Sequence, residues 1–171
     1  LMPVSEFEGN LSWGYNPSFR FAVDKFYGPK EKLKELVNAC HERGIAVIMD
    51  IVPNHSFGTD PMVRLYQDAS GAAADDNPWF NAVSRHAFSP GYDFNHEDPW
   101  TREFWKRVFD FWLDEFHLDG YRVDLSKGLT QTNTGSDVGA WNQCDQSRVD
   151  ILFDYANHIW ADHPGAYMIL E

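Results

Sequence analysis

The hydrophobic positions along the first third of the chain change from a helical period to a strand-like run. Between residues 30 and 43 the apolar side chains recur at helical spacing, at Leu33, Leu36, Val37 and Cys40. This spacing, followed by Gly44, predicts an amphipathic helix. Residues 45–52 then form an almost unbroken apolar run with one charge, Asp50, which predicts a strand buried on both faces. A helix leading directly into a buried strand is half of a βαβ unit.

The rest of the chain repeats this order after a long interruption. Residues 53–97 have no period and are rich in Gly, Pro, Asn, Asp and Ser, and the stretch is far longer than an ordinary connection. The pattern then predicts a helix, a strand, a polar loop, a helix and a strand, at residues 99–117, 118–125, 128–142, 145–161 and 166–170. Alternating helices and strands are typical of a parallel α/β protein.

Acidic side chains stand at the ends of the predicted strands. In the strand at 118–125, period-two alternation puts Arg122 and Asp124 on one face, and Asp124 lies at the carboxyl end, where α/β enzymes keep their sites. Asp50 and Glu171 occupy comparable places in two other strands. Paired carboxylates are what acetal hydrolysis requires, because one protonates the leaving oxygen while the other attacks or activates water. The alternative is an Arg–Asp pair that only holds the strands together.

Composition narrows the function classes. The chain has 26 acidic and 14 basic residues and a net charge of −12, which repels phosphate backbones and anionic lipids, so we expect no nucleic-acid or membrane partner. No apolar run is long enough for a transmembrane helix, and no signal peptide is visible after Leu1. The two cysteines, Cys40 and Cys144, form neither a disulfide framework nor a zinc motif. The compartment stays open.

Three segments resemble the first three signatures of the α-amylase superfamily, glycoside hydrolase family 13. They are Asp-Ile-Val-Pro-Asn-His at 50–55, Gly-Tyr-Arg-Val-Asp at 120–124 with Lys127, and Tyr-Met-Ile-Leu-Glu at 167–171. The resemblance implies part of a (β/α)8 TIM barrel, at residues 1–52 and 98–171, because a complete barrel takes roughly 250 residues. Residues 53–97 would then be an inserted, loop-rich subdomain.

The resemblance also implies roles for the residues at the strand ends. Asp124 would be the nucleophile that forms a covalent glycosyl intermediate, and Glu171 the general acid and later the base. Arg122 would keep Asp124 ionised, and Asp50 would be a structural partner of that arginine.

Other matching positions would contact substrate. Trp13-Gly14-Tyr15 resembles the family's loop that carries a sugar-stacking tyrosine, so Tyr15 would be a stacking platform. His55 would donate a hydrogen bond to the sugar, and Lys127 would lie toward the leaving group. The chain departs from the pattern at Gly128, where amylases often have a histidine. The family's fourth signature, with a further aspartate, does not occur between residues 1 and 171.

No metal or cofactor is expected to be required. A structural calcium ion is the one candidate, because Asn54 and either Asp93 or Asn95 occupy positions that resemble the family's calcium-binding loop, and oxygen ligands suit that ion. Many relatives lack that site.

The interpretation put first is a retaining hydrolase of α-1,4-linked glucans such as starch, glycogen and maltooligosaccharides. A transglycosylase such as a branching enzyme would share every residue named above. A catalytically incomplete, glucan-binding fragment is the third alternative. We also expect self-association, because an incomplete barrel leaves strand edges unpaired.

Overall fold

A short parallel sheet forms the centre of the molecule. The computed structural model describes the whole chain, residues 1–171. Its central strands are β3 (Ile48–Ile51), β6 (Gly120–Val123) and β7 (Tyr167–Leu170), in the order β3-β6-β7. All three run parallel with no register shift, so their carboxyl ends lie level at one edge. This is the arrangement predicted from the alternation of helices and strands.

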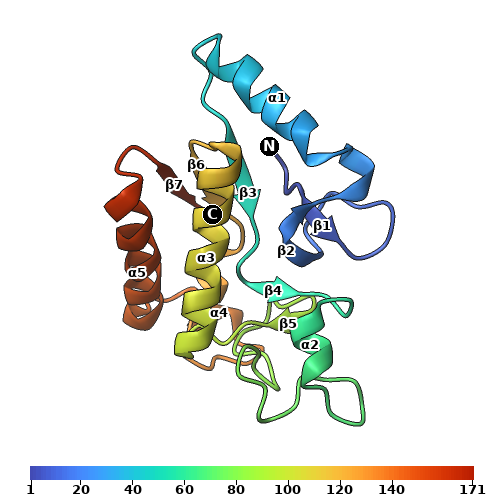
Figure 1. Cartoon of the computed structure of the whole chain (residues 1–171). Helices are drawn as coiled ribbons and strands as arrows, with labels where there is room; N and C mark the ends of the chain where they lie inside the picture. The colour runs from blue at the N-terminus through green and yellow to red at the C-terminus, as the bar shows by residue number, and fades with distance from the viewer.

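The three long helices confirm the predicted periodicities. They are α1 (Lys30–His41), α3 (Pro99–Phe116) and α5 (Gln146–Asp162), and Figure 1 shows α3 and α5 side by side. Helix α3 begins where Asp98 accepts a hydrogen bond from the Trp100 amide, with Pro99 in its first turn. Its apolar stripe is fully buried at Trp105, Val108, Phe109 and Trp112. The helices therefore supply most of the apolar cover of the sheet.

The strands are shorter than the apolar runs that predicted them. The run at 45–52 yields a strand only over Ile48–Ile51. The Val47 amide donates to the side chain of Asp119 at 2.6 Å instead of joining a strand ladder. Leu1 lies beside β3, since its amino group donates to the Ile48 carbonyl and its own carbonyl accepts from the Asp50 amide. Backbone hydrogen bonds thus join the first residue of the chain to β3.

An antiparallel hairpin near the N-terminus was not predicted. Strand β1 (Ser5–Phe7) pairs with β2 (Pro17–Val23), with irregular register. The inward position of Arg20, which is 4% exposed, breaks the apolar alternation that would have indicated a strand. Arg20 is accommodated because it donates to the His55 carbonyl and lies 3.5 Å from a carboxylate oxygen of Asp60.

Residues 53–97 form a compact excursion with little regular structure. It contains β4 (His55–Ser56), α2 (Pro61–Leu65) and β5 (Tyr92–Asp93), and β4 pairs with β5 so that its two ends meet (Figure 1). Its buried side chains, among them Phe80 and Phe94, belong to the same hydrophobic cluster as the residues of α3. A further short helix, α4 (Val138–Trp141), lies in the loop before α5.

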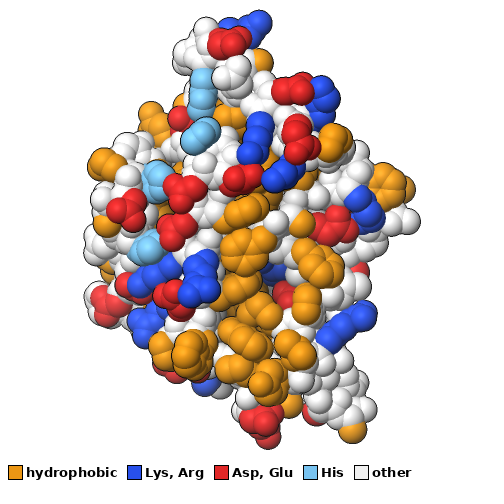
Figure 2. All heavy atoms as spheres, viewed as in Figure 1, with side chains coloured by type: hydrophobic (Ala, Val, Ile, Leu, Met, Phe, Trp, Pro, Cys, Tyr) orange, Lys and Arg blue, Asp and Glu red, His pale blue; other side chains and the backbone are white.

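Hydrophobic side chains remain on the surface in two places. Figure 2 shows a band of them along one face. Among the exposed aromatic residues, Phe21 of β2 packs edge-on against Phe104 and Phe111 of α3. The second place is β7, which pairs with β6 on one side only and leaves Ile169 and Leu170 about half exposed. Self-association through strand edges stays a prediction. No helix has both the length and the apolar character needed to cross a membrane.

Gly120 provides a test of how tightly the sheet is assembled. Its φ is +145°, and a Cβ atom there would lie 2.2 Å from the Tyr167 carbonyl oxygen. We expect Gly120→Ala to lower the free energy of unfolding by about 2–4 kcal/mol, because backbone strain adds to a clash with neighbouring backbone. Urea denaturation measures this. Gly165→Ala is the matched control, because its Cβ would meet nothing within 4 Å, and its effect should stay within about 0.5 kcal/mol. Equal effects of the two changes would contradict this prediction.

Candidate active site

Arg122 joins three carboxylates at the carboxyl edge of the sheet. The parallel register sets Asp50 of β3 beside Arg122 of β6. One terminal nitrogen of Arg122, Nη1, lies 3.0 Å from Asp50 Oδ2 and 3.2 Å from Asp124 Oδ1, and the other, Nη2, lies 2.7 Å from Glu171 Oε1. The expectation that these four residues meet is confirmed. Strand alternation could predict it because β3, β6 and β7 end level with one another.

The turn after β6 directs the two candidate catalytic carboxylates toward each other. The Asp124 amide donates to the Ile51 carbonyl at 2.8 Å, which continues the strand pairing to the site. Leu125 then adopts a left-handed conformation, with φ of 50°, which is uncommon for a side chain of its kind. Its amide donates to Glu171 Oε2 at 2.8 Å. Leu125 was missed in the sequence, because nothing in the local pattern signals its backbone conformation.

Burial and neighbouring charge set the order of the two pKa values. Burial, together with the charge of Glu171, raises the pKa of Asp124 to about 6, although Arg122 opposes the shift. The Leu125 amide and, after it, Arg122 lower the pKa of Glu171 in spite of partial burial. Arg122 contacts Asp124 and lowers its pKa, but burial and the charge of Glu171 outweigh this effect. That Arg122 keeps Asp124 ionised during the reaction stays a prediction.

Tyr15 lies beside this centre. Its hydroxyl donates to Asp50 Oδ2 at 2.6 Å, and burial together with that carboxylate raises the pKa of the phenol to about 12. The ring is half-buried and lines a pocket, so the position leaves it available for stacking. Gly14 allows the chain to reach this place, because its φ is +94° and a Cβ would lie 2.4 Å from the Pro3 carbonyl oxygen.

His55 is buried and uses both ring nitrogens inside the protein. Nε2 lies 2.9 Å from the Tyr15 carbonyl oxygen, and Nδ1 lies 3.0 Å from the Asn54 side-chain nitrogen. Burial lowers the pKa of His55 to about 4, so the ring is neutral, with Nε2 as its donor. In this arrangement His55 fixes the backbone of Tyr15. Direct donation to a sugar stays a prediction, and it would require Nε2 to leave the Tyr15 carbonyl.

Two adjoining pockets border the carboxylate centre. The first, of about 410 Å³, is lined by Tyr15, His55, Asp124, Leu125 and residues 87–90. The second, of about 260 Å³, is lined by Phe88, Leu125, Lys127, Trp141 and Glu171. Phe88 and Leu125 belong to both, so the pockets form one cleft with Asp124 on one side and Glu171 on the other.

The second pocket contains Lys127, which was predicted as a site residue, and Phe88 and Trp141, which were not. Lys127 donates to the Asn142 side chain at 2.9 Å, and its ammonium lies 5.4 Å from the centre of the Trp141 ring. It therefore lies on the Glu171 side of the cleft, and its place toward the leaving group stays a prediction. Phe88 and Trp141 were not identified, because Phe88 lies in the aperiodic stretch 53–97 and Trp141 ends the four-residue helix α4, within residues predicted as a polar loop. Their only local signal was an aromatic residue within a polar, Gly-containing stretch.

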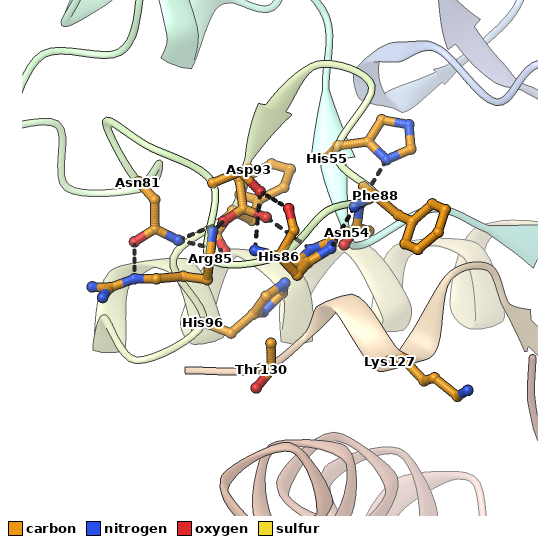
Figure 3. Close-up of polar contacts among 12 residues, drawn as sticks. Asn54, His55, Asn81, Arg85, His86, Phe88, Asp93, His96, Lys127 and Thr130 are labelled. Carbon is orange, nitrogen blue, oxygen red and sulfur yellow. Dashed lines mark hydrogen bonds and ion pairs between the residues drawn. The ribbon is translucent and has the colours of Figure 1, made fainter. Parts of the chain in front are cut away.

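The residues considered for calcium do not all lie together in the structure. Asn54 and Asp93 are fully buried in one polar cluster, which Figure 3 shows. Asn95 is not part of it, because its side-chain oxygen accepts from the Glu97 amide in the turn before α3. No group of three or more His, Cys, Asp and Glu side chains could hold a metal ion.

The fold and the carboxylate centre define a class of protein, a partial (β/α)8 barrel with its acidic residues at the carboxyl ends of the strands. Residues 3–89 match the family model described as the catalytic domain of α-amylase. The chain therefore belongs to the α-amylase family of glycoside hydrolases.

Curated relatives give a more specific likeness. The chain is 32% identical, over 177 residues, to a 1,4-α-glucan branching enzyme of Methylobacillus flagellatus, covering all of this chain and 24% of that enzyme. It is 33% identical, over 180 residues, to a 1,4-α-glucan branching enzyme of Shewanella frigidimarina, again covering all of this chain and 23% of that enzyme. The chain thus spans about a quarter of the length of these relatives.

Solved structures bear out the fold. An Anoxybacillus α-amylase superposes with a TM-score of 0.75 at 20% identity, covering 98% of this chain and 34% of the amylase. A pullulanase from Bacillus acidopullulyticus superposes with a TM-score of 0.68 at 25% identity, covering 99% of this chain and 20% of the pullulanase. The partial barrel expected from the sequence is confirmed by these likenesses.

The raised pKa of Asp124 predicts a pH-dependent gain of stability in Asp124→Asn. A carboxyl whose folded pKa lies above its unfolded value destabilises the fold once it ionises, so wild-type stability should fall between pH 4 and 6. Asparagine does not titrate. The variant should therefore exceed wild type by on the order of 2–3 kcal/mol at pH 8, and the gain should vanish near pH 4.

Urea denaturation at pH 4, 6 and 8 measures this difference. Asp75→Asn is the matched control, because Asp75 is exposed and lies outside the cleft. It should show no pH-dependent gain. An Asp124→Asn variant with the same offset from wild type at every pH would contradict the assigned burial and charge coupling.

Proposed function

We propose that the protein carrying this chain transfers segments of α-1,4-linked glucan by a retaining, two-step reaction. The convergence of Asp124 and Glu171 on the guanidinium of Arg122, across a cleft, is the observation that carries the proposal. Both carboxyls contact one guanidinium, so they are close enough for direct attack on a bound sugar. Retaining enzymes hold the two carboxyl groups about 5–5.5 Å apart for this purpose.

In the first step an oxygen of the Asp124 carboxylate bonds to the anomeric carbon while the bond from that carbon to the leaving oxygen breaks. Glu171 gives its proton to that oxygen. In the second step an acceptor hydroxyl attacks the anomeric carbon and the bond to Asp124 breaks. The Glu171 carboxylate takes the hydroxyl proton. Two inversions return the original configuration.

The proton must sit on Glu171 before the first step, whereas the free site favours it on Asp124. We propose that a sugar entering the cleft draws Glu171 away from the Leu125 amide and from Arg122. Both contacts lower the pKa of Glu171, so their loss raises it. The same movement removes the charge that raises the pKa of Asp124. Substrate binding would thus set the protonation state that the reaction needs.

The acceptor decides between transfer and hydrolysis. The curated relatives described above are named as 1,4-α-glucan branching enzymes, which favours a sugar hydroxyl as the acceptor and a 1,6 branch as the product. The sequence interpretation put hydrolysis first, and water would use the same residues. The aromatic Phe88 and Trp141 on the Glu171 side of the cleft support an acceptor sugar, because aromatic faces bind sugar rings.

Product analysis with amylose distinguishes these outcomes. If the acceptor is a sugar, the purified protein should create 1,6 linkages, seen by proton NMR, with few new reducing ends. Reducing ends in proportion to cleaved bonds would assign hydrolysis instead. Binding of amylose without either product would leave only a glucan-binding role.

The separate roles of the two carboxylates predict different responses to an activated substrate. Glu171→Gln should lose about 10²–10⁴-fold of its rate on amylose, as expected for a missing general acid. It should lose much less on α-maltosyl fluoride, because fluoride leaves without a proton. Asp124→Asn should be inactive on both, since no nucleophile remains. Rates of fluoride release and of amylose conversion check this. Fluoride activity retained by Asp124→Asn and lost by Glu171→Gln would reverse the assignment.

A further inference from the structure

A buried polar cluster lies directly beneath the cleft, at the position considered above for calcium. Asn54, His86 and Asp93, all within residues 53–97, are each at most 3% exposed although their side chains are polar. In Figure 3 the ring of His86 lies between Asn54 and Asp93. Three of their atoms face this interior without a hydrogen-bond partner: Asn54 Oδ1, His86 Nε2 and Asp93 Oδ1. Two acceptors and one ring nitrogen therefore converge on one buried point.

Oxygen atoms are suitable ligands for a cation. Here, however, the oxygen atoms are too few, and some already accept other hydrogen bonds. Calcium takes six to eight oxygen ligands. Here Asp93 Oδ2 already accepts from the Asn81 side chain at 2.8 Å and from the Arg85 amide at 3.1 Å. The remaining oxygen, Oδ1, faces His86 Nε2 at 3.3 Å. The residues present do not fit calcium.

The ring of His86 is oriented by its other nitrogen. The Phe88 amide donates to Nδ1 at 3.2 Å, so Nδ1 is an acceptor and Nε2 carries the hydrogen, 3.3 Å from Asp93 Oδ1 but without a hydrogen bond to it. The ring also stacks on Trp141, with centroids 5.5 Å apart and planes 12° from parallel. The ring of His86 is therefore held in place with Nε2 in the interior that Asn54 Oδ1 and Asp93 Oδ1 also face.

Gly128 closes the cluster from the side of the β6 loop. A Cβ atom at Gly128 would lie 1.6 Å from Asn54 Oδ1 and 2.9 Å from His86 Nε2. Any side chain there would displace both groups. The departure from the family pattern at position 128 thus has a physical reason, because His86 and Asn54 fill the space that a side chain would need.

We propose that the imidazole of His86 takes the place of a structural cation between Asn54 and Asp93, and makes this wall of the cleft independent of metal. The consequence reaches the cleft through Phe88. Its amide is held by His86, and its carbonyl accepts from the Asn54 side chain at 3.2 Å. His86 is thus a positioning residue for an aromatic side chain that lines both pockets.

The first test uses the unmodified protein. Its melting temperature should be the same in excess EDTA and in excess calcium chloride. A wild-type protein that loses several degrees in EDTA, or gains several in calcium, would overturn the proposal, whatever any variant does.

The second test exchanges the imidazole for an oxygen ligand. His86→Asp should lose stability in EDTA and recover about 5 °C or more in calcium, because a ligand that binds only the folded state stabilises it. Terbium should report the site directly, since Trp141 lies close enough to sensitise its emission. The variant should give sensitised terbium emission that calcium displaces, and wild type should not.

His158→Asp is the matched control. His158 also pairs with an aspartate, Asp110, at 2.8 Å, but both side chains are about one-third exposed. This exchange should bring neither calcium-dependent stability nor terbium emission. If His86→Asp behaves like His158→Asp, the cluster is not a cation position, and the proposal fails.

Discussion

One positive charge holds the candidate active site together. Arg122 faces the carboxylates of Asp50, Asp124 and Glu171, and no second cation joins them. Charges removed from water are costly unless they are paired, so three carboxylates around one guanidinium cannot all ionise without penalty. Asp124 is the least exposed of the three and carries that penalty as a raised pKa. The strands end level with one another and Leu125 adopts a left-handed conformation, and both features keep these groups in contact.

The excess of negative charge also suits the proposed chemistry. A sugar that loses its leaving group develops positive charge at the ring, and a preorganised anionic centre stabilises that charge without reorganising. The same excess raises the pKa of Asp124, whereas the Leu125 amide and Arg122 lower that of Glu171. Substrate contacts that displace Glu171 would change both pKa values. The excess of negative charge around Arg122 weakens the fold locally. The same excess supplies the reactivity that we propose.

Residues 53–97 form one wall of the cleft. It shares the hydrophobic cluster of α3 through Phe80 and Phe94, and it brings His86 against Asn54 at the end of β3. This packing presents Phe88 to both pockets. A stretch with almost no regular structure is held in place by buried side-chain hydrogen bonds, of which the contacts of Asp93 are the centre.

The sequence by itself determined α1, α3, α5 and the alternation of helices and strands along the chain, because amphipathic period and helix caps are local properties. Alternation within β6 likewise determined that Arg122 and Asp124 share a face. Only the tertiary structure decided the β1–β2 hairpin, since Arg20 is buried by partners at His55 and Asp60. It also decided which carboxyl has the raised pKa, and the places of His86 and Leu125. Burial, and distances between segments far apart in the chain, are set by packing, and no local pattern encodes them.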